Sequence, residues 1–295
     1  MKLLGAHMSI SGGVDTSLPR GAAVGCDTIQ IFTKSNNQWR ARPLDDDEIQ
    51  RFRQGQIETG ISPVVAHDSY LINLASPDDA LYAKSVDAFG TELDRCEALG
   101  IPYLVTHPGS HMGSSEEAGI ERIAAALNRL LGERPRQRVM VLLETTAGQG
   151  RSVGHRFEHL RDIRDRLETA ERVGVCIDTC HVFAAGYDLR TERSYNTVMA
   201  EFERLVGLAQ VKAFHLNDCK KDLGCRVDRH EHIGKGFLGV DAFRWLMNDS
   251  RFDGLPMLLE TPKGEDCAED RENLEVLRGL IGDRTTRPAR RKAAR

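Results

Sequence analysis

The chain has 295 residues, of which 40% are hydrophobic and 28% charged, and its formal net charge is −4. This composition is typical of a soluble globular protein with a large core, and it argues against a disordered chain or a uniformly basic surface for polyanions. No apolar run approaches the roughly 20 residues that cross a bilayer, and residues 1–10 lack the apolar core of a signal peptide. Seven scattered cysteines suit a reducing compartment, so we expect a cytoplasmic protein without a membrane partner.

Short apolar runs alternate along the chain with segments of helical character. The runs cover residues 2–6, 28–32, 61–66, 101–106, 139–143, 173–177, 211–214 and 256–259. Helices are predicted at residues 15–24, 44–58, 77–99, 115–131, 155–171, 194–208, 240–248 and 269–281. Ser76 before Pro77 predicts the start of the third helix, and Gly100 predicts its end. Runs rich in Val, Ile and Leu are typical of buried parallel strands, so the alternation predicts an α/β fold, a (β/α)8 TIM barrel.

Residues 1–282 are expected to form one catalytic domain, since no linker or composition shift divides them and such barrels take roughly 250 residues. Residues 283–295 differ in character. They contain six basic residues against one acidic residue and no apolar periodicity. We therefore predict a basic, disordered tail there.

Six of the apolar runs end at a side chain that is able to bind metal. These are His67, His107, Glu144, Asp178, His215 and Glu260. The carboxyl ends of the strands share one face of a parallel barrel, so the six side chains are expected to converge. Imidazole nitrogens and carboxylate oxygens without thiolates favour zinc or manganese, and the set is too large for one tetrahedral ion. The sequence therefore predicts a multinuclear metal centre.

Three further residues extend this set. His181 follows one strand end by three residues, and the D-x-H spacing of Asp228 and His230 places both side chains on the same side of an extended segment. Nine ligands then divide over three ions. His232 competes with His230 as the ligand, while His7 lacks a partner pattern and is expected to lie outside the direct ligands.

Metal would also change the charge of the cleft. Glu144, Asp178, Asp228 and Glu260 contribute −4, and three divalent ions would add +6. A mildly acidic chain can therefore have a locally positive cleft.

Two other patterns are weaker signals. Residues 234–239 match G-x-G-x-x-G, but they follow a polar loop instead of a strand, so a tight loop beside the metal site is expected instead of a dinucleotide site. The spacings of Cys176, Cys180, Cys219 and Cys225 fit a zinc ribbon poorly.

Longer motifs resemble the endonuclease IV family of apurinic/apyrimidinic (AP) endonucleases. They are residues 67–74, 107–111, 144–150, 176–188, 215–218 and 226–230, in this order. The resemblance spans residue 1 to about residue 281, and several long motifs in one order are highly specific. It implies a zinc enzyme of DNA base-excision repair on a TIM barrel, which cleaves the phosphodiester 5′ to an abasic site. The products would be a 3′-hydroxyl and a 5′-deoxyribose phosphate, and blocked 3′ ends would also be trimmed.

The resemblance also implies roles for individual residues. It implies three zinc sites: His67, His107 and a bridging Glu144; Glu144, Asp178, His215 and Glu260; and His181, Asp228 and His230. Glu144 and Glu260 would be the catalytic carboxylates.

The implied partner is double-stranded DNA with abasic sites or blocked 3′ ends, bound by a monomer. Its contacts would come from Asn37, Gln38 and Trp39 after the second strand and from Tyr70 after the third. The best-known members insert an arginine where this chain has Asn37, so the other three are expected to do more of the penetration of a bent duplex. A packing role for Trp39 fits the sequence equally well.

Two other functions are compatible with the metal-ligand pattern. A sugar isomerase or epimerase of the xylose-isomerase-like barrels would use one or two ions and no third site. A lesion-binding protein with structural zinc would have closed coordination without an open position for water. His181, Asp228 and His230 count against the first, and nine ligands over three ions count against the second.

Overall fold

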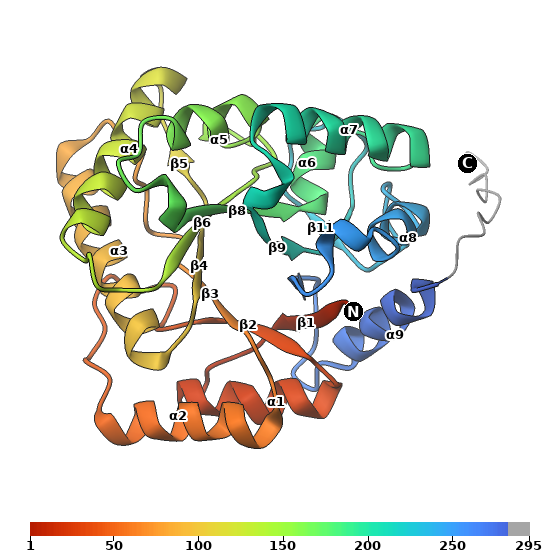
Figure 1. Ribbon diagram of the computed structural model, residues 1–295, viewed down its shortest axis with the longest axis horizontal. Coiled ribbons are helices and arrows are strands. Elements are labelled where there is room, and N and C mark those ends of the chain that lie inside the picture. Colours follow the sequence, from red (N-terminus) through yellow and green to blue (C-terminus); the bar gives the residue numbers. More distant parts are fainter. Residues whose placement is uncertain (283–295) are drawn as a thin grey trace.

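The computed structural model describes residues 1–282, and within them parallel strands close into a barrel surrounded by helices (Figure 1). The barrel strands are β1 (Leu3–His7), β2 (Thr28–Phe32), β3 (Val64–His67), β4 (Tyr103–Thr106), β6 (Met140–Glu144), β8 (Val173–Asp178), β9 (Val211–His215) and β12 (Pro256–Leu259). Their order around the barrel is β1, β12, β9, β8, β6, β4, β3 and β2. β1 pairs with both β2 and β12, so the first and last strands close the barrel. The predicted TIM-barrel fold is confirmed, and the predicted tail lies outside the described residues.

Apolar side chains fill the inside of the barrel. The buried cluster there consists of Val65, Val105, Leu142, Cys176, Ala213 and Leu258. Because side chains on a strand alternate between its two faces, the residue two positions later faces the same interior. That residue is in turn His67, His107, Glu144, Asp178, His215 and Glu260. The apolar layer thus supports the candidate ligands directly above it, at the carboxyl ends of the strands.

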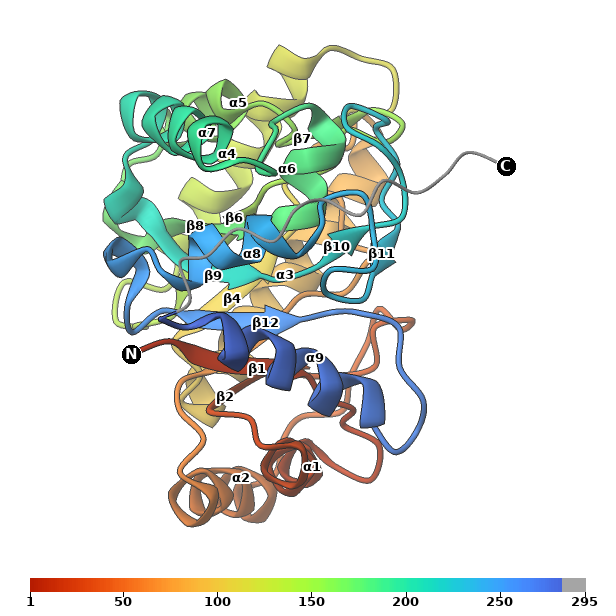
Figure 2. The same ribbon diagram turned by 90° about the vertical axis from the view of Figure 1, so that its right-hand side faces the viewer.

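Helices cover the outer face of the barrel. They are α1 (Ser17–Val24), α2 (Asp46–Thr59), α3 (Asp79–Leu99), α4 (Glu116–Gly132), α5 (Phe157–Arg164), α6 (Thr179–Ala185), α7 (Glu192–Leu205), α8 (Val240–Met247) and α9 (Ala268–Leu280). In α4, Ser115 caps the helix by accepting a hydrogen bond from the Ala118 amide, and Ile120, Ile123 and Leu127 bury one face. Figure 2 shows α9 lying across β1 and β12, beside α1.

The helices differ from the prediction at three places. The segment predicted as one helix over residues 155–171 is α5 followed by a turn and a 3-10 turn, Ala170–Arg172. The N-cap of α3 is Asp78 and not Ser76, because the Asp78 carboxylate accepts from the Leu81 amide while Ser76 precedes the helix. Gly100 ends α3 as predicted, with φ 74. The third difference is α6, which the sequence pattern did not predict.

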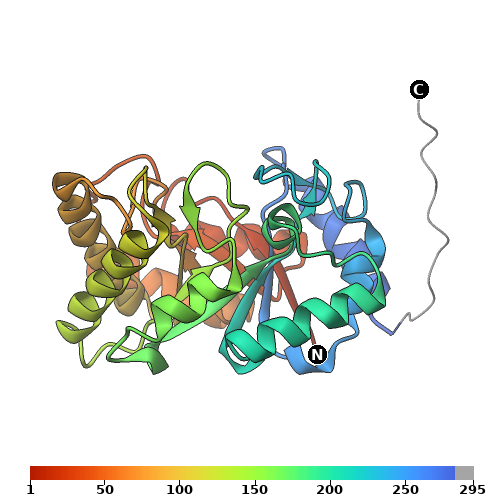
Figure 3. The ribbon, with the colours of Figure 1, turned by 90° about the horizontal axis from the view of Figure 1, so that it is seen from above.

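Two short antiparallel pairs extend the loops after the strands. β5 (Gly109–Ser110) pairs with β7 (Ser152–Val153), and β10 (Asp218–Cys219) pairs with β11 (His230–Glu231). In Figure 3 the loops that carry these pairs rise on one side of the barrel, away from the N-terminus. They form the rim around the candidate ligands. Across residues 1–282, no helix combines the length and the apolar character that a membrane span requires.

Candidate metal centre

Glu144 lies fully buried at the centre of the strand-end residues. Its Oε2 atom is 3.1 Å from His67 Nε2 and 3.2 Å from His107 Nε2. Its Oε1 atom is 3.0 Å from His215 Nδ1 and 3.1 Å from His181 Nδ1. Each carboxylate oxygen therefore faces different imidazoles, and His181 Nδ1 faces Oε1 as a donor. With His67 and His107 at one oxygen and His215 at the other, the carboxylate is placed to bridge two metal ions.

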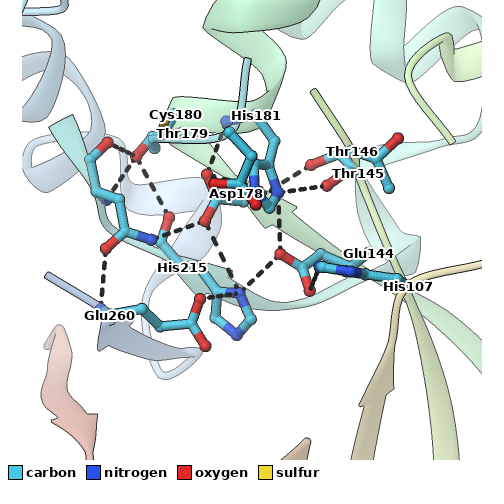
Figure 4. Close-up of polar contacts among 12 residues, drawn as sticks. His107, Glu144, Thr145, Thr146, Asp178, Thr179, Cys180, His181, His215 and Glu260 are labelled. Atoms are coloured by element: carbon cyan, nitrogen blue, oxygen red, sulfur yellow. Dashed lines mark hydrogen bonds and ion pairs between the residues drawn. The ribbon is translucent and has the colours of Figure 1, made fainter. Parts of the chain in front are cut away.

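Two groups of donor atoms meet at this carboxylate. In one group the ligand atoms of His67, His107 and Glu144 lie within 4.8 Å of one another. In the other, those of Glu144, Asp178, His215 and Glu260 do so. Figure 4 shows His215 pointing between Glu260 and Glu144, with Asp178 above it in this view. These groups have the same members as the first two sets that the sequence predicted.

A third group forms at the start of α6. Asp178 caps this helix by accepting a hydrogen bond from the His181 amide at 2.8 Å, which places the two side chains together. The two Asp228 oxygens lie 3.2 Å from His181 Nε2 and 3.2 Å from His230 Nε2. His230 Nε2 is also 3.6 Å from Asp178. All three predicted members of the third set therefore meet, with Asp178 between them and the second group.

Backbone carbonyl groups hold three of the imidazoles in one orientation. His67 Nδ1 lies 2.8 Å from the Asp68 carbonyl oxygen, His181 Nδ1 2.9 Å from that of Thr145, and His230 Nδ1 3.2 Å from that of Glu260. A carbonyl oxygen only accepts, so each Nδ1 carries a proton, and the lone pair of the neutral ring is then on Nε2. Such outer contacts are typical of metal-binding histidines.

The residues present fit a divalent metal ion. Within the described part of the chain, His181 Nε2 and His230 Nε2 are buried and make no hydrogen bond. A buried polar atom without a hydrogen bond is costly, and a cation beside Asp228 would satisfy both. The donors are imidazole and carboxylate throughout, the set that suits zinc and manganese.

The electrostatics of the group agree with this fit. Burial alone would lower the pKa of His67, but the neighbouring carboxylates, first of all Glu144, raise it to about 9. Burial alone would raise the pKa values of the acids, but His215 and the other imidazoles hold that of Glu144 well below its usual range and lower that of Glu260 to about 2. The carboxylates therefore stay ionised, and positive charge nearby stabilises them.

Asn217 and Asp218 are two residues in contact with the candidate site that the sequence reasoning missed. Asn217 Nδ2 donates to Asp178 at 2.7 Å, and its Oδ1 accepts from the Glu260 amide at 2.9 Å. Asp218 accepts from the Gly236 amide at 2.9 Å, where a Cβ atom would lie 2.4 Å from the carboxylate. Residues 234–239 thus form the expected tight loop beside the site. The signal was available, since both residues closely follow His215.

The two remaining histidines near the site have other partners. His7 Nδ1 lies 3.0 Å from Gln30 Nε2, and Gln30 is a third residue that the sequence reasoning missed. His232 Nδ1 lies 3.1 Å from Asn273 Nδ2. Among residues 1–282, neither histidine belongs to a group of metal donors. The geometry therefore favours His230 over His232 as the ligand.

The predicted DNA-contact residues lie on the rim. Asn37 and Gln38 are exposed, whereas Trp39 is half-buried against the core, with Lys84 Nζ 4.2 Å from its ring centre. Tyr70 is 60% exposed, and its ring centre lies 5.6 Å from that of His67 and 6.2 Å from that of His107. Tyr70 thus stands directly over the metal donors, while Trp39 packs against the protein.

Comparisons with known proteins show the family of this chain. The family described as xylose isomerase-like TIM barrel matches residues 18–280. A probable endonuclease 4 of Chloroflexus aurantiacus is 59% identical over 281 residues, which are 95% of this chain and 99% of that protein. The crystal structure of endonuclease IV from Thermus thermophilus superposes with a TM-score of 0.83 at 38% identity, covering 95% of this chain and 99% of that one.

A more distant structure marks the limit of such comparisons. The 3-keto-D-glucoside 4-epimerase of E. coli has a TM-score of 0.68 at 16% identity, with 95% of this chain and 100% of that chain covered. That likeness shows the fold alone. The matches at high identity also establish the family. This chain belongs to the endonuclease IV family of xylose isomerase-like TIM barrels.

Proposed function

We propose that this protein is a zinc-dependent AP endonuclease of DNA base-excision repair. It hydrolyses the phosphodiester 5′ to an abasic site in double-stranded DNA, leaving a 3′-hydroxyl and a 5′-deoxyribose phosphate. It also trims blocked 3′ ends by the same phosphoester hydrolysis. The observation that carries the proposal is the buried Glu144 carboxylate with two imidazole nitrogens at each oxygen, in a chain of the endonuclease IV family.

Three zinc ions would be held by nine side chains. The sets are His67, His107 and Glu144; Glu144, Asp178, His215 and Glu260; and His181, Asp228 and His230. When bound, the ions would lower the pKa of water and neutralise the charge that develops on the phosphodiester. The donor groups around Glu144 support the first two sets. The contacts of Asp228 with the buried Nε2 atoms of His181 and His230 support the third.

Glu260 is the carboxylate best placed to move a proton. Its Oε1 accepts a hydrogen bond from Gln30 at 2.6 Å, so its Oε2 is the oxygen left to face the reacting groups. Its pKa of about 2, set by His215 against the effect of burial, keeps it ionised at neutral pH. Glu260 accepts the proton of the attacking water as the water oxygen bonds to phosphorus and the bond between phosphorus and O3′ breaks. The leaving O3′ takes up a proton from solvent and becomes the 3′-hydroxyl. Glu144 stays ionised and holds the surrounding imidazoles in place.

Recognition of the lesion falls to the rim above the ligands. Tyr70 is the large exposed ring beside His67 and His107, and its face fills the gap in the base stack where the base is missing. The Ser69 hydroxyl donates to the Asn36 carbonyl at 2.6 Å, which ties the loop of Asn37 and Gln38 to the segment of Tyr70. Trp39 contributes by packing and keeps this loop in shape.

The sugar isomerase reading is disfavoured by the third group of ligands. A barrel of that kind needs one or two ions, and it leaves His181, Asp228 and His230 without a role. Here these three side chains meet at 3.2 Å and lie beside Asp178. We therefore keep the nuclease as the proposed function.

A single incision assay tests the proposal. Purified protein with about three zinc ions per chain should cut a duplex that contains one abasic analogue, and Glu260→Gln should abolish the cut. Glu133→Gln is the matched control, because the ion pairs of Glu133 are with Arg129 and Arg134 and with none of the proposed ligands. A metal-replete protein that leaves the duplex intact but epimerises a ketose would disprove the nuclease. One ion per chain by elemental analysis would disprove the trinuclear centre, and light scattering tests the monomer that we propose.

A further inference from the structure

Gln30 is a polar residue in the apolar interior of the barrel. It lies in the middle of β2 and pairs in register with Val65, a member of the interior layer. Its side chain is fully buried. A primary amide in such a place is unfavourable unless every donor and acceptor is used. Its hydrogen bonds therefore indicate why an amide is needed at this position.

The Gln30 amide joins two of the proposed ligands. Its Nε2 lies 2.6 Å from Glu260 Oε1, and its Oε1 lies 2.7 Å from His215 Nε2. An ionised carboxylate only accepts hydrogen bonds, so the amide nitrogen must face Glu260. The amide oxygen then faces His215, which must donate from Nε2. The chemistry of the neighbours determines the orientation of the amide.

A third contact anchors the amide from the other side. Gln30 Nε2 also lies 3.0 Å from His7 Nδ1, where its second hydrogen is used. The His7 backbone is itself held, because its carbonyl oxygen accepts from Lys263 Nζ at 2.7 Å. β1 and the segment after β12 thus support the position of Gln30.

These bonds select one atom of each ligand for the metal. With its proton on Nε2, His215 keeps its lone pair on Nδ1, which lies 3.0 Å from Glu144 and 3.3 Å from Glu260 Oε2. With Oε1 bonded to Gln30, Glu260 presents Oε2 on the same side. His215 Nδ1 and Glu260 Oε2 therefore both face the space between His215, Glu144 and Glu260.

We propose that Gln30 is a positioning residue that orients His215 and Glu260 for the second zinc ion. The inference rests on the proposed metal centre and names a residue outside the nine ligands. Gln30 acts through two ligands of one site, so its removal should weaken one ion and spare the other two.

Substitution of Gln30 with metal-binding readouts tests this role. Gln30→Met keeps the size of the side chain and removes all three hydrogen bonds. Competition with a chromogenic chelator should show the affinity for one of three zinc ions falling by roughly 10- to 100-fold. In cobalt-substituted protein, the absorption of that one site should change. Gln30→Asn is too short to reach both ligands, so an intermediate loss is expected, and it carries the test if Gln30→Met does not fold.

Thr28→Val is the matched control. Thr28 is a buried residue on the same face of β2, and its hydroxyl donates to the Pro63 carbonyl at 2.5 Å, away from the ligands. The Thr28→Val substitution should lower the urea midpoint of unfolding. It should leave all three zinc affinities within about twofold of wild type, because Thr28 touches no ligand. Equal metal loss in Thr28→Val and the Gln30 variants would overturn the inference, as would folded Gln30 variants with unchanged affinities. Wild-type protein without zinc would instead overturn the proposed function.

Discussion

Two clusters of histidine and glutamate lie on this molecule, and their charge balance differs. The central cluster surrounds Glu144, and within residues 1–282 the recorded ion pairs of this carboxylate are all with histidines. The peripheral cluster consists of Glu116, His155 and His159, whose donor atoms also lie within 4.8 Å of one another. By residue type alone, both resemble metal sites.

Arg156 makes the difference in the peripheral cluster. Its Nη2 lies 2.7 Å from Glu116, and its Nε lies 3.0 Å from His159 Nε2. The Gly154 amide donates to His159 Nδ1 at 3.1 Å and Arg156 Nε donates to His159 Nε2, so both ring nitrogens face N–H donors. His159 Nε2 also lies 3.2 Å from Glu116. Burial, His155 and Arg156 lower the pKa of His159 to about 4, whereas that of His67 rises to about 9.

The contrast teaches what identifies a metal centre in this fold. The peripheral carboxylate already has a permanent cation, Arg156, and both ring nitrogens of the buried His159 already face N–H donors. Within residues 1–282 the ion pairs of the central carboxylates are all with imidazoles, and the buried Nε2 atoms of His181 and His230 lie 3.2 Å from Asp228 without a hydrogen bond. The absence of a permanent cation beside the carboxylates, more than the types of donor atom, therefore distinguishes the candidate metal site from the peripheral cluster.

The largest expected effect comes from exchanging one glutamate in each cluster. Glu144→Gln removes the bridging anion, so incision of an abasic duplex should fall at least about a hundredfold and bound zinc should decrease. Glu116→Gln should leave both within about twofold, since Arg156 already balances that residue. Incision assays with elemental analysis measure this. Full zinc content and normal incision in Glu144→Gln would remove the basis of the comparison.

Thermal unfolding gives the next largest effect. Because an ion that binds only the folded state stabilises it, each zinc at a hundred times its Kd should add about 2.7 kcal/mol to the free energy of unfolding. Metal-stripped wild type should therefore gain several degrees in Tm when zinc is added. The gain should shrink in Glu144→Gln and persist in Glu116→Gln. An unchanged Tm in wild type would contradict zinc binding at the central cluster.

The pH dependence of stability should have opposite signs in the two clusters. The pKa of His159 falls from 6.5 to about 4 on folding, so its contribution is complete above pH 6.5 and is lost as pH falls toward 4. The loss should be on the order of 2 kcal/mol, and His159→Gln should remove it. The raised pKa of His67 in metal-free protein stabilises below pH 6.5 and loses this effect as pH rises through about 9. Urea unfolding at pH 4.5, 7 and 9 in the presence of chelator measures the pH dependence of the free energy of unfolding. The same pH dependence in wild type and His159→Gln would refute the prediction for His159.

Arg156→Met should give the smallest effect. It tests directly whether Arg156 lowers the pKa of His159 and keeps metal away from the peripheral cluster. Removing this cation should raise the pKa of His159 toward 6.5, which NMR titration of the imidazole would record. No additional zinc should bind, because Gly154 still donates to Nδ1 and leaves the proton on Nε2. One more ion per chain than in wild type would show that Arg156 alone keeps metal away from this cluster.

Local sequence predicted the parts of the fold that depend on local contacts. β2 and β12 have the predicted bounds, since runs such as residues 28–32 are apolar and bounded by polar segments. The prediction was wrong where a local signal was ambiguous. Residues 155–171 have helical composition, yet the helix ends at Arg164 because the chain must turn there to enter β8. The helix α6 was missed because its seven residues are too few to show a period.

The sequence by itself determined where the apolar runs that form strands lie along the chain. It also determined which side chains stand at the carboxyl ends of these runs. The period of two along a strand then sufficed to place six ligands on one face. Only the tertiary structure decided which atoms meet. Glu144 lies among four imidazoles, and Gln30 bonds to residues 185 and 230 positions away. Such contacts depend on closure of the barrel, which brings β2 and β12 to either side of β1, and no local pattern in the sequence records it.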